Sequence, residues 1–384
     1  MKVIYFSQPF FADCDFPLIK EMQEREMDVR YYIPIGHNFS NSSILEFEKP
    51  ICKWGIHKGK YIAGMDKYKD CLNIDNLYFI CGRTYKWWPL TWLLWLFVFF
   101  HMLFYKADII HITWQLRGLE KVLLYLPFIS TKVMTVHDPL QHSSVIDFEQ
   151  NEKARIECFK WATHFILLNN QQVNSFSKKY SIPKNKITVS KLGVYNSIKY
   201  LNLKKSKSKE PYVLFFGLIT PHKGIEYLLD AMLQVNKVCK GVNLLIAGSG
   251  HIYFDLTKYA DKEYIIIKNR YIGISELAEM VGNALFVVCP YKDATQSGVV
   301  QTAFAMGVPV IATNVGALPN MVKNDIFGKI VPPCDSEALA SAIIELIKDK
   351  EKLNSLKNNI ETQWISTMSW KPIVDDYIRV YEMN

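Results

Sequence analysis

The sequence has little cysteine, and no two cysteines have the spacing that is typical of metal-binding and redox motifs. Its 384 residues include eight cysteines, and no two of them are spaced as C-x-x-C. A disulfide scaffold, a zinc ribbon and a thioredoxin-type centre are therefore excluded, and we expect reduced thiols in a cytoplasmic protein. The first apolar run, Val3–Phe6, ends at Ser7 and is too short for the core of a secretory signal. The Walker P-loop, H-E-x-x-H, the EF-hand loop and G-x-S-x-G are also absent from the sequence.

A strong charge imbalance is missing as well. Lys and Arg total 45 against 37 Asp and Glu, which gives a net charge of +8. This mild basic excess fits an anionic partner such as a nucleotide or a phospholipid headgroup. No basic stripe with interleaved aromatic residues occurs, so we do not expect a nucleic-acid partner. The length predicts two domains rather than one.

Aromatic residues are abundant and locally concentrated. Four of the nine tryptophans lie between Trp87 and Trp95, inside a run of nineteen uncharged residues that ends at Tyr105. The run is long enough for a membrane span, but Pro89 and His101 interrupt it and the next strand of the same sheet follows it. We therefore rank a buried helix, or a helix lying on a bilayer, above a span. The surface version, with Trp92 and Trp95 in the lipid, accounts for both the aromatic residues and the basic excess.

Short β-type runs alternate with helical stretches in both halves of the chain, which predicts an α/β protein with parallel sheets. The segment LKKSKSKEP at 203–211 has the composition of a linker between two similar halves. The predicted strands are 2–7, 29–33 (stopped by Pro34), 108–112, 132–136 and 165–168, then 212–216, 242–247, 264–268, 285–289 and 308–312. Helices are predicted at 18–26, 338–348 and 370–381, and the last has apolar residues at 3- and 4-residue spacing.

Three glycine-containing segments follow predicted strands of the second half. In FFGLITPHKG, at 215–224, Lys223 lies at a turn where it can face an anion beside a helix N-terminus. In IAGSG, at 246–250, glycine lets the backbone approach a ligand. In CPYKDATQSGVV, at 289–300, a Ser-Gly pair begins a buried helix and offers free backbone N–H groups to phosphate oxygens. Taken singly, the first segment fits a solvated loop lysine equally well, and the glycine pair of the second fits a plain tight turn better than a ligand site.

Together, in this order and spacing, and with GVPVIATNVGALPNMV and GKIVPP after them, these segments resemble the donor half of family 4 glycosyltransferases. The similarity runs from Tyr212 to about Leu346, while Asp108–His111, Thr135–Pro139 and Trp370–Tyr381 resemble the acceptor half and its returning helix. The resemblance implies the GT-B fold, in which two Rossmann-like domains face a cleft. The acceptor domain would be residues 1–200 and the nucleotide-sugar domain residues 201–369, with a C-terminal helix at about 370–384 packing back on the first.

The resemblance also assigns roles by position. Lys223 would hold the donor diphosphate and stabilise the leaving phosphate, and His137 would lie at the transferred sugar. Gly217 would let the donor pass close to the backbone. The other donor-side candidates are Gly248, Arg270, Thr295, Gln296, Ser297, Gly298 and Val299, and the last three would supply amides. The acceptor-side candidates are Asp13, Asp15 and Asp138.

Some family positions are altered in this chain. Leu218 stands where many members carry an arginine, and Ala294 and Thr302 stand where many carry two glutamates. Arg270 is a candidate to replace the arginine, and Asp293, Gln296 or Gln301 could supply the hydroxyl contacts. Asp13-Cys14-Asp15 has the D-x-D spacing of metal-dependent transferases, but it follows the first strand, so we interpret these residues as loop acids and expect no metal site.

The expected function is retaining, metal-independent transfer of a sugar from a nucleotide-sugar, UDP- or GDP-linked, to a saccharide or lipid-linked saccharide. It would need no cofactor and would serve surface polysaccharide or glycolipid synthesis at the inner face of the membrane. Two alternatives stay open. A catalytically inert nucleotide-sugar-binding subunit is favoured by Leu218, Ala294 and Thr302, and a GT-B sugar-nucleotide epimerase would require acidic residues in the cleft.

Overall fold

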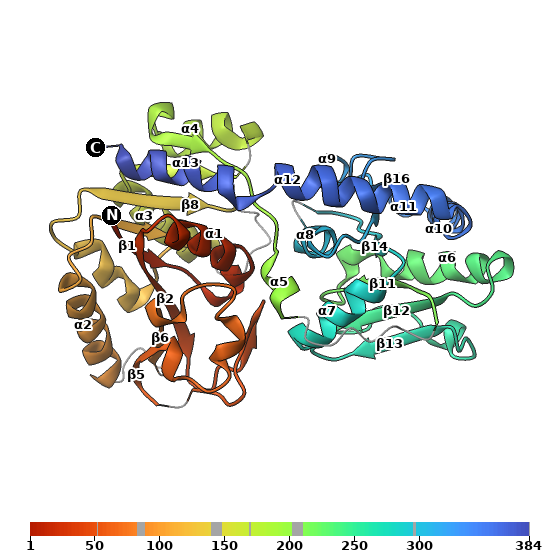
Figure 1. Cartoon of the computed structure of the whole chain (residues 1–384), viewed down its shortest axis with the longest axis horizontal. Helices are drawn as coiled ribbons and strands as arrows, with labels where there is room; N and C mark the ends of the chain where they lie inside the picture. Colours follow the sequence, from red (N-terminus) through yellow and green to blue (C-terminus); the bar gives the residue numbers. More distant parts are fainter. Residues whose placement is uncertain are drawn as a thin grey trace. The chain divides into compact units, whose positions relative to one another are not determined.

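The computed structural model describes residues 1–51, 53–82, 89–139, 148–168, 170–201, 210–294 and 297–383. They fall into two compact α/β units, shown in Figure 1: unit 1 is Met1–Gly193 with Ser369–Asn384, and unit 2 is Val194–Met368. The first boundary lies before the predicted residue 200, because the short helix α5 (Ser197–Tyr200) contacts α7 (Ile274–Asn283) and α8 (Gly298–Ala305) of unit 2. Residues 202–209 of the predicted linker lie outside the described part of the chain.

The main sheet of unit 1 is parallel except at one edge, where β5 runs antiparallel to β6. Its order is β10-β9-β8-β7-β1-β2-β6-β5. The strands are β1 (Lys2–Phe6), β2 (Asp28–Gly36), β5 (Gly55–Lys58), β6 (Leu77–Gly82), β7 (Ile109–Ile112), β8 (Thr131–Val136), β9 (His164–Leu167) and β10 (Ile187–Val189), while β3 (Asn41–Ser42) and β4 (Leu45–Glu46) form a separate pair. Its α-helices are α1 (Ala12–Glu24), α2 (Pro89–Leu103), α3 (Phe148–Trp161), α4 (Val173–Tyr180) and α13 (Trp370–Glu382).

Strand β2 continues through Pro34 to Gly36, so the prediction that Pro34 stops it is wrong. The backbone groups of successive residues in a strand point alternately to the two neighbouring strands. Those of Tyr32 point toward β1, because its carbonyl accepts a hydrogen bond from the amide of Ser7. The nitrogen of Pro34 faces the same side, where β1 has already ended at Phe6. The missing N–H therefore costs no ladder bond, and on its other side β2 pairs with β6.

The C-terminal helix α13 belongs to unit 1, where it contacts α1, β8 and β10. Its apolar positions are buried, as their spacing predicts: Trp370, Ile373, Val374, Tyr377, Val380 and Tyr381. The indole of Trp370 occupies the space beside Gly193, where a Cβ atom would lie only 2.4 Å from the ring. Glycine at this position thus lets the end of unit 1 meet the helix that returns to it.

Unit 2 is built on an all-parallel sheet in the order β13-β12-β11-β14-β15-β16. The strands are β11 (Tyr212–Phe216), β12 (Asn243–Gly248), β13 (Ile265–Asn269), β14 (Val287–Cys289), β15 (Val310–Thr313) and β16 (Gly328–Val331). Besides α5, α7 and α8, the unit contains the helices α6 (Ile225–Val238), α9 (Leu318–Val322), α10 (Ser336–Lys348), α11 (Lys350–Asn359) and α12 (Ile365–Thr367). The central strands β11, β14 and β15 are wholly buried, as expected of a parallel sheet covered on both faces.

The aromatic run forms α2, which lies along the β5–β6 side of the unit 1 sheet (Figure 1). Among the described residues, no helix is both long and apolar enough to cross a membrane. Trp87 and Trp88 lie outside the described residues. Trp95 is only 9% exposed and packs near Phe6, so placing it in lipid is wrong, whereas Trp92 is 61% exposed.

Candidate functional site

The three glycine-containing segments of unit 2 follow β11, β12 and β14, three strands that are neighbours in the sheet. In a parallel sheet the carboxyl ends of the strands meet at one edge, and ligands bind there. Gly217 ends the β11 segment with φ +122°, and Gly248 ends β12 with φ +151°. A Cβ on Gly248 would lie 1.8 Å from the carbonyl oxygen of Gly217, so only glycine allows the two turns to run side by side. At these two positions the backbone is therefore not covered by a side chain of its own.

Lys223 is placed by a second close approach of backbones. It ends the turn Pro221–Lys223, and Gly224 follows with φ +63° as the N-cap of α6. A Cβ on Gly224 would lie 2.1 Å from the carbonyl oxygen of Pro290, so glycine lets this turn rest on the segment after β14. There the Lys223 Nζ lies 3.7 Å from the ring centroid of Tyr291, a close cation–π contact.

The ammonium group of Lys223 is half-buried and has no counter-ion among the residues that the structure describes. Within the described residues, no carboxylate lies within 4 Å of Lys223 Nζ. Burial lowers its pKa, because removal from water disfavours the charged form. Beneath it, the hydroxyl of the buried Tyr291 has no hydrogen-bond partner in the part of the chain that the structure describes. A desolvated cation without an acid beside it is the electrostatic signature of an anion-binding site.

The N-terminus of α8 faces the same region. Ser297 caps the helix, and its Oγ accepts from the Val300 amide at 3.4 Å. The amides of Gly298 and Val299 precede the first intrahelical bond, which runs from the Gln301 amide to the Ser297 carbonyl. A Cβ on Gly217 would lie 3.6 Å from the Val299 side chain, so the end of β11 adjoins this helix start. The sequence-predicted residues Gly217, Gly248, Lys223 and Ser297–Val299 therefore gather at one edge of unit 2.

Arg270 is also close to this edge, but its guanidinium is engaged elsewhere. Its amide donates to the Gly248 carbonyl at 3.1 Å, while Nη1 and Nη2 donate to the Glu276 carboxylate at 2.8 and 2.6 Å. It is thus neutralised by an acid rather than presented to a ligand. Leu218, which stands in the arginine position, is 64% exposed. Thr295 and Gln296 lie outside the described residues.

Sequence reasoning missed the residues that fix Lys223 in place. Tyr291 lies under its ammonium, and the Lys292 amide donates to the His222 carbonyl at 2.8 Å. Lys292 Nζ then pairs with Glu226 at 2.8 Å, which ties the loop after β14 to the start of α6. The adjacent Tyr-Lys pair in CPYKD was visible in the sequence, but its partners lie about 65 residues away and no spacing reveals them.

In unit 1, His137 follows β8 at the carboxyl edge. Its ring stacks on Phe11, with centroids 3.9 Å apart and planes at 15°. Burial lowers the pKa of His137 to about 3, so the imidazole is neutral at physiological pH. Its Nε2 is buried and has no hydrogen-bond partner within the described ranges. The neighbouring Asp138 is exposed, and its backbone carbonyl accepts from Arg155 at 2.7 Å.

Asp13 and Asp15 lie in the first turn of α1, so their interpretation as loop acids is wrong. The Asp15 carboxylate is buried and accepts from the hydroxyls of Tyr5 at 2.8 Å and Tyr31 at 2.9 Å. Burial raises the pKa of Asp15 to about 7 and that of Asp13, which accepts from the Ser43 hydroxyl, to about 6. Asp15 thus belongs to a buried tyrosine cluster. Within the described residues, no group of three or more His, Cys, Asp or Glu side chains could hold a metal ion.

A cavity of about 270 Å³ lies at the carboxyl ends of β1, β2 and β6 in unit 1. Gln8 and Glu120 contribute polar groups to it, and Thr91, Leu94 and Trp95 contribute the inner side of α2. Burial raises the pKa of Glu120 to about 7. This mixture of an indole, an amide and a carboxyl group suits a sugar ring with its hydroxyls.

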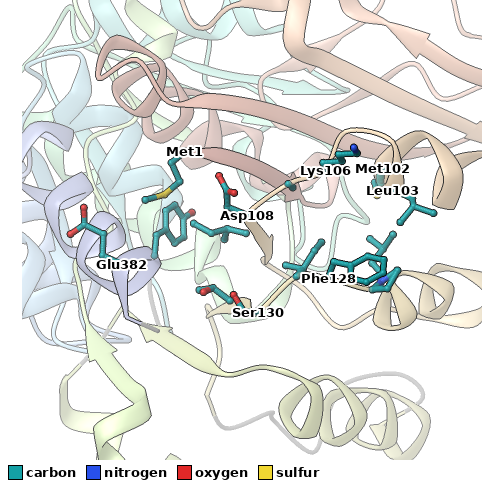
Figure 2. A pocket seen from close by; sticks show the side chains of 15 residues that line it. Met1, Met102, Leu103, Lys106, Asp108, Phe128, Ser130 and Glu382 are labelled. Atoms are coloured by element: carbon teal, nitrogen blue, oxygen red, sulfur yellow. The ribbon is translucent and has the colours of Figure 1, made fainter.

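A larger cavity of about 780 Å³ lies at the opposite edge of the sheet, where β7 and β8 begin. Figure 2 shows Lys106, Leu103 and Phe128 on one side of it and Met1 and Glu382 on the other. It lies at the amino ends of its strands, away from the edge that carries His137 and the smaller cavity.

Comparison with known proteins finds a family model that matches this part of the chain. Residues 210–349, which hold the gathered site of unit 2, match the family described as Glycosyl transferases group 1. An uncharacterized glycosyltransferase of Methanocaldococcus jannaschii is 26% identical over 222 residues, which are 53% of this chain and 56% of that relative. The capsular polysaccharide biosynthesis glycosyltransferase CapM of Staphylococcus aureus is 26% identical over 249 residues, 59% of this chain and 63% of that protein. The chain thus spans about half the length of the curated relatives it matches.

Solved structures resemble the whole chain. The crystal structure of Anabaena Alr3699/HepE in complex with UDP superimposes with a TM-score of 0.66 at 14% sequence identity, and the match covers 99% of both chains. At this identity the likeness shows the fold, which is GT-B with two Rossmann-like domains, as the sequence predicts.

Proposed function

We propose that this chain, which carries a group 1 glycosyltransferase domain at residues 210–349, transfers a sugar from a nucleotide-sugar to a saccharide or lipid-linked saccharide. The observation that carries the proposal is the half-buried Lys223, which has no carboxylate within 4 Å among the described residues and lies in the part of unit 2 that holds the α8 N-terminus. A nucleoside diphosphate supplies the missing negative charge. Its oxygens would accept from the Gly298 and Val299 amides, while Gly217 and Gly248 leave room for it along the backbone.

The chemistry of transfer explains why a cation belongs there. Breaking the bond between the sugar and the diphosphate builds negative charge on the leaving phosphate. A fixed donor aimed at such charge contributes about 3 kcal/mol to transition-state stabilisation. Lys223 and the α8 amides supply this stabilisation without a metal ion in our proposal. The donor is UDP- or GDP-linked, and the UDP complex of the similar Anabaena structure makes UDP the first to test.

We further propose that transfer proceeds with retention of the anomeric configuration. The neutral imidazole of His137, at the carboxyl edge of unit 1, would contact the transferred sugar. A surface polysaccharide or a glycolipid is the proposed product, in keeping with the capsular enzyme among the relatives. The enzyme would work in the cytoplasm, at the inner face of the membrane.

A panel of UDP-, GDP-, ADP- and CDP-sugars tests the proposal. We expect one nucleotide class to raise the unfolding temperature of the protein, with and without EDTA. Slow hydrolysis of that donor, followed by NMR of the released sugar or of a glycoside product, reports the anomeric configuration. If no member of the panel shifts the unfolding temperature, the proposed donor site is wrong. Binding without any turnover, even with candidate acceptors, would identify a non-catalytic binder instead.

A further inference from the structure

Helix α2 turns a row of large apolar side chains toward solvent. Leu90, Leu93, Phe97 and Phe100 follow one another at 3- and 4-residue spacing, and each is between 40% and 53% exposed. Phe104, just beyond the helix, continues the row and is 77% exposed. Residues three or four apart lie on one face of a helix, so these side chains form a continuous ridge. Trp92 and Leu96 lie beside it and are exposed as well. We call these seven residues the α2 ridge.

The burial of the opposite side of α2 makes the ridge unusual. Leu94, Trp95, Val98 and Met102 pack into the core of unit 1, which is enough to hold the helix in place. On the outer side, the Trp54 ring packs against Phe97 with centroids 6.1 Å apart, and the ridge side chains remain at least 40% exposed. No charged residue occurs between Pro89 and Tyr105. A helix that is apolar all round is normally covered on both sides. Exposed apolar patches of this kind mark interaction sites.

Basic residues cluster at the C-terminal half of α2. The Arg30 guanidinium lies 4.0 Å from the ring centroid of Tyr105, and Lys2 Nζ lies 5.6 Å from the same ring. Lys58 Nζ lies 5.9 Å from the ring of Tyr78, to which Arg30 is also close. The exposed Lys106 follows Tyr105 directly. Across the described ranges, none of these four cations makes an ion pair with a carboxylate, so their charge is available to an anionic partner.

A second exposed aromatic residue lies near the end of the ridge. Phe128 is 97% exposed and has φ +63°, a backbone conformation that is strained for a side chain of this size. It borders the 780 Å³ cavity together with Leu103 and Lys106, as Figure 2 shows. Phe128 and Lys106 therefore lie near the C-terminal end of α2, where the ridge ends at Phe104.

The size of the ridge favours a lipid bilayer over a second copy of the chain. A helix of fifteen residues is about 22 Å long and about 10 Å wide. That area is about a quarter of the roughly 800 Å² that each partner contributes to a stable protein interface. A bilayer needs no matching surface, because each aromatic or leucine side chain gains by entering the headgroup region separately. Unpaired cations beside the ridge would meet anionic headgroups.

We infer that unit 1 docks on an anionic phospholipid bilayer through the α2 ridge, with Arg30, Lys58, Lys106 and Lys2 on the headgroups. The inference rests on the proposed function for its membrane setting, and it identifies the face that the protein turns to the lipid. Insertion of the ridge supplies the apolar part of the affinity, and the cations select acidic lipids.

Co-sedimentation of the full chain with sucrose-loaded vesicles tests the inference. Vesicles of phosphatidylcholine with about 30% phosphatidylglycerol should bind the protein, and pure phosphatidylcholine vesicles should bind it much more weakly. Phe97→Ser with Phe100→Ser should lower the partition coefficient on the order of 30-fold. Lys58→Gln with Lys106→Gln should lower it about fivefold for each charge, and only on the acidic vesicles. Leu256→Ser with Ile326→Ser, two comparably exposed apolar residues of unit 2, is the matched control and should bind like the parent.

Two results would overturn the inference. One is equal binding of the parent and the Phe97/Phe100 variant to acidic vesicles, at matched unfolding temperatures. The other is a concentration-dependent dimer in sedimentation velocity that the same variant abolishes, which would make a second copy the occupant. Nucleotide binding is measured in parallel on every variant. If the parent protein does not bind a nucleotide, the proposed function is refuted. The vesicle result then still tests the docking face independently.

Discussion

Replacing Lys223 with methionine separates its electrostatic role from its packing. Methionine keeps the length and apolar stem of the side chain but removes the charge. In the free protein the ammonium is half-buried without a carboxylate within 4 Å among the described residues, and burial lowers its pKa. The substitution removes this desolvation cost together with the contact to Tyr291, which is worth about 1 kcal/mol. The free energy of unfolding should therefore stay within about 1 kcal/mol of the parent value.

Diphosphate binding should respond very differently. The ammonium is the one described cation whose Nζ lies over Tyr291, in the loop that follows β14. A charge-assisted contact to a phosphate oxygen is worth about 3 kcal/mol in a water-poor site. The dissociation constant for the nucleoside diphosphate should rise about 100-fold in Lys223→Met. Isothermal titration with UDP, or with whichever nucleotide the panel selects, measures it.

Lys223→Arg is the control that retains charge. Because burial lowers the pKa of Lys223, the parent should lose diphosphate affinity at a lower pH than a solvated lysine would allow. The arginine variant stays charged, so this alkaline decline should be missing from it. Unchanged nucleotide affinity in Lys223→Met would refute the role of Lys223. A loss of unfolding free energy well above 2 kcal/mol in the free protein would refute the claim that its charge serves the ligand rather than the fold.

Three further predictions concern the scaffold. Gly248→Ala should lower the free energy of unfolding in urea by about 3 kcal/mol, because its Cβ would overlap the Gly217 carbonyl. Gly241→Ala, with φ +82° and open space around it, should lower it only by the backbone strain of about 1 to 2 kcal/mol. Equal losses in the two variants would contradict the close approach of Gly248 to Gly217. Burial lowers the pKa of His111 to about 3 from an ordinary value of 6.5, so the unfolded chain takes up this proton first, and the contribution of His111 to stability should fall by about 2 kcal/mol from pH 7 to pH 5. His111→Gln should remove that part of the pH dependence, and an unchanged pH profile would show that His111 does not carry it. Trp95→Ser should destabilise unit 1 by about 4 kcal/mol and Trp92→Ser by less than about 1, and similar values would contradict the difference in exposure between the two side chains, 9% for Trp95 and 61% for Trp92.

The core strands were predictable because each is a short apolar run between helices. The runs at 212–216 and 132–136 coincide with β11 and β8 to within a residue. Strand β5 escaped prediction because it is a short antiparallel edge strand of mixed polarity whose place depends on pairing with β6. Strand β6 was missed although it is an apolar run like the other core strands. The end of β2 was misjudged because proline is harmless only where the neighbouring strand has stopped, a fact of the sheet rather than of the local sequence.

The candidate site was predictable to the extent that it follows strand ends. Glycine turns and the Ser-Gly helix start come directly after β11, β12 and β14, so their gathering follows from the topology of a parallel sheet. What escaped prediction depends on contacts across the fold. Tyr291 under Lys223 and the tyrosine hydroxyls on Asp15 are such contacts. The same limit applies to Arg270, which the sequence suggested as a phosphate ligand in place of the missing arginine. Its ion pair with Glu276 engages the guanidinium and could not be foreseen from the sequence.

The two sides of α2 connect the proposed reaction with the proposed location. Its inner side, with Thr91 and Trp95, lines the 270 Å³ cavity that also holds Gln8 and Glu120 at the carboxyl edge of unit 1. Its outer side is the ridge that we place on the bilayer. A lipid-linked saccharide has a sugar to be extended and an apolar chain that stays in the membrane, and a helix about 10 Å thick separates a surface suited to each. A soluble saccharide acceptor would use the cavity but gain nothing from the ridge. The apolar outer side of α2 therefore favours the lipid-linked acceptor of the two classes that the site chemistry alone leaves open.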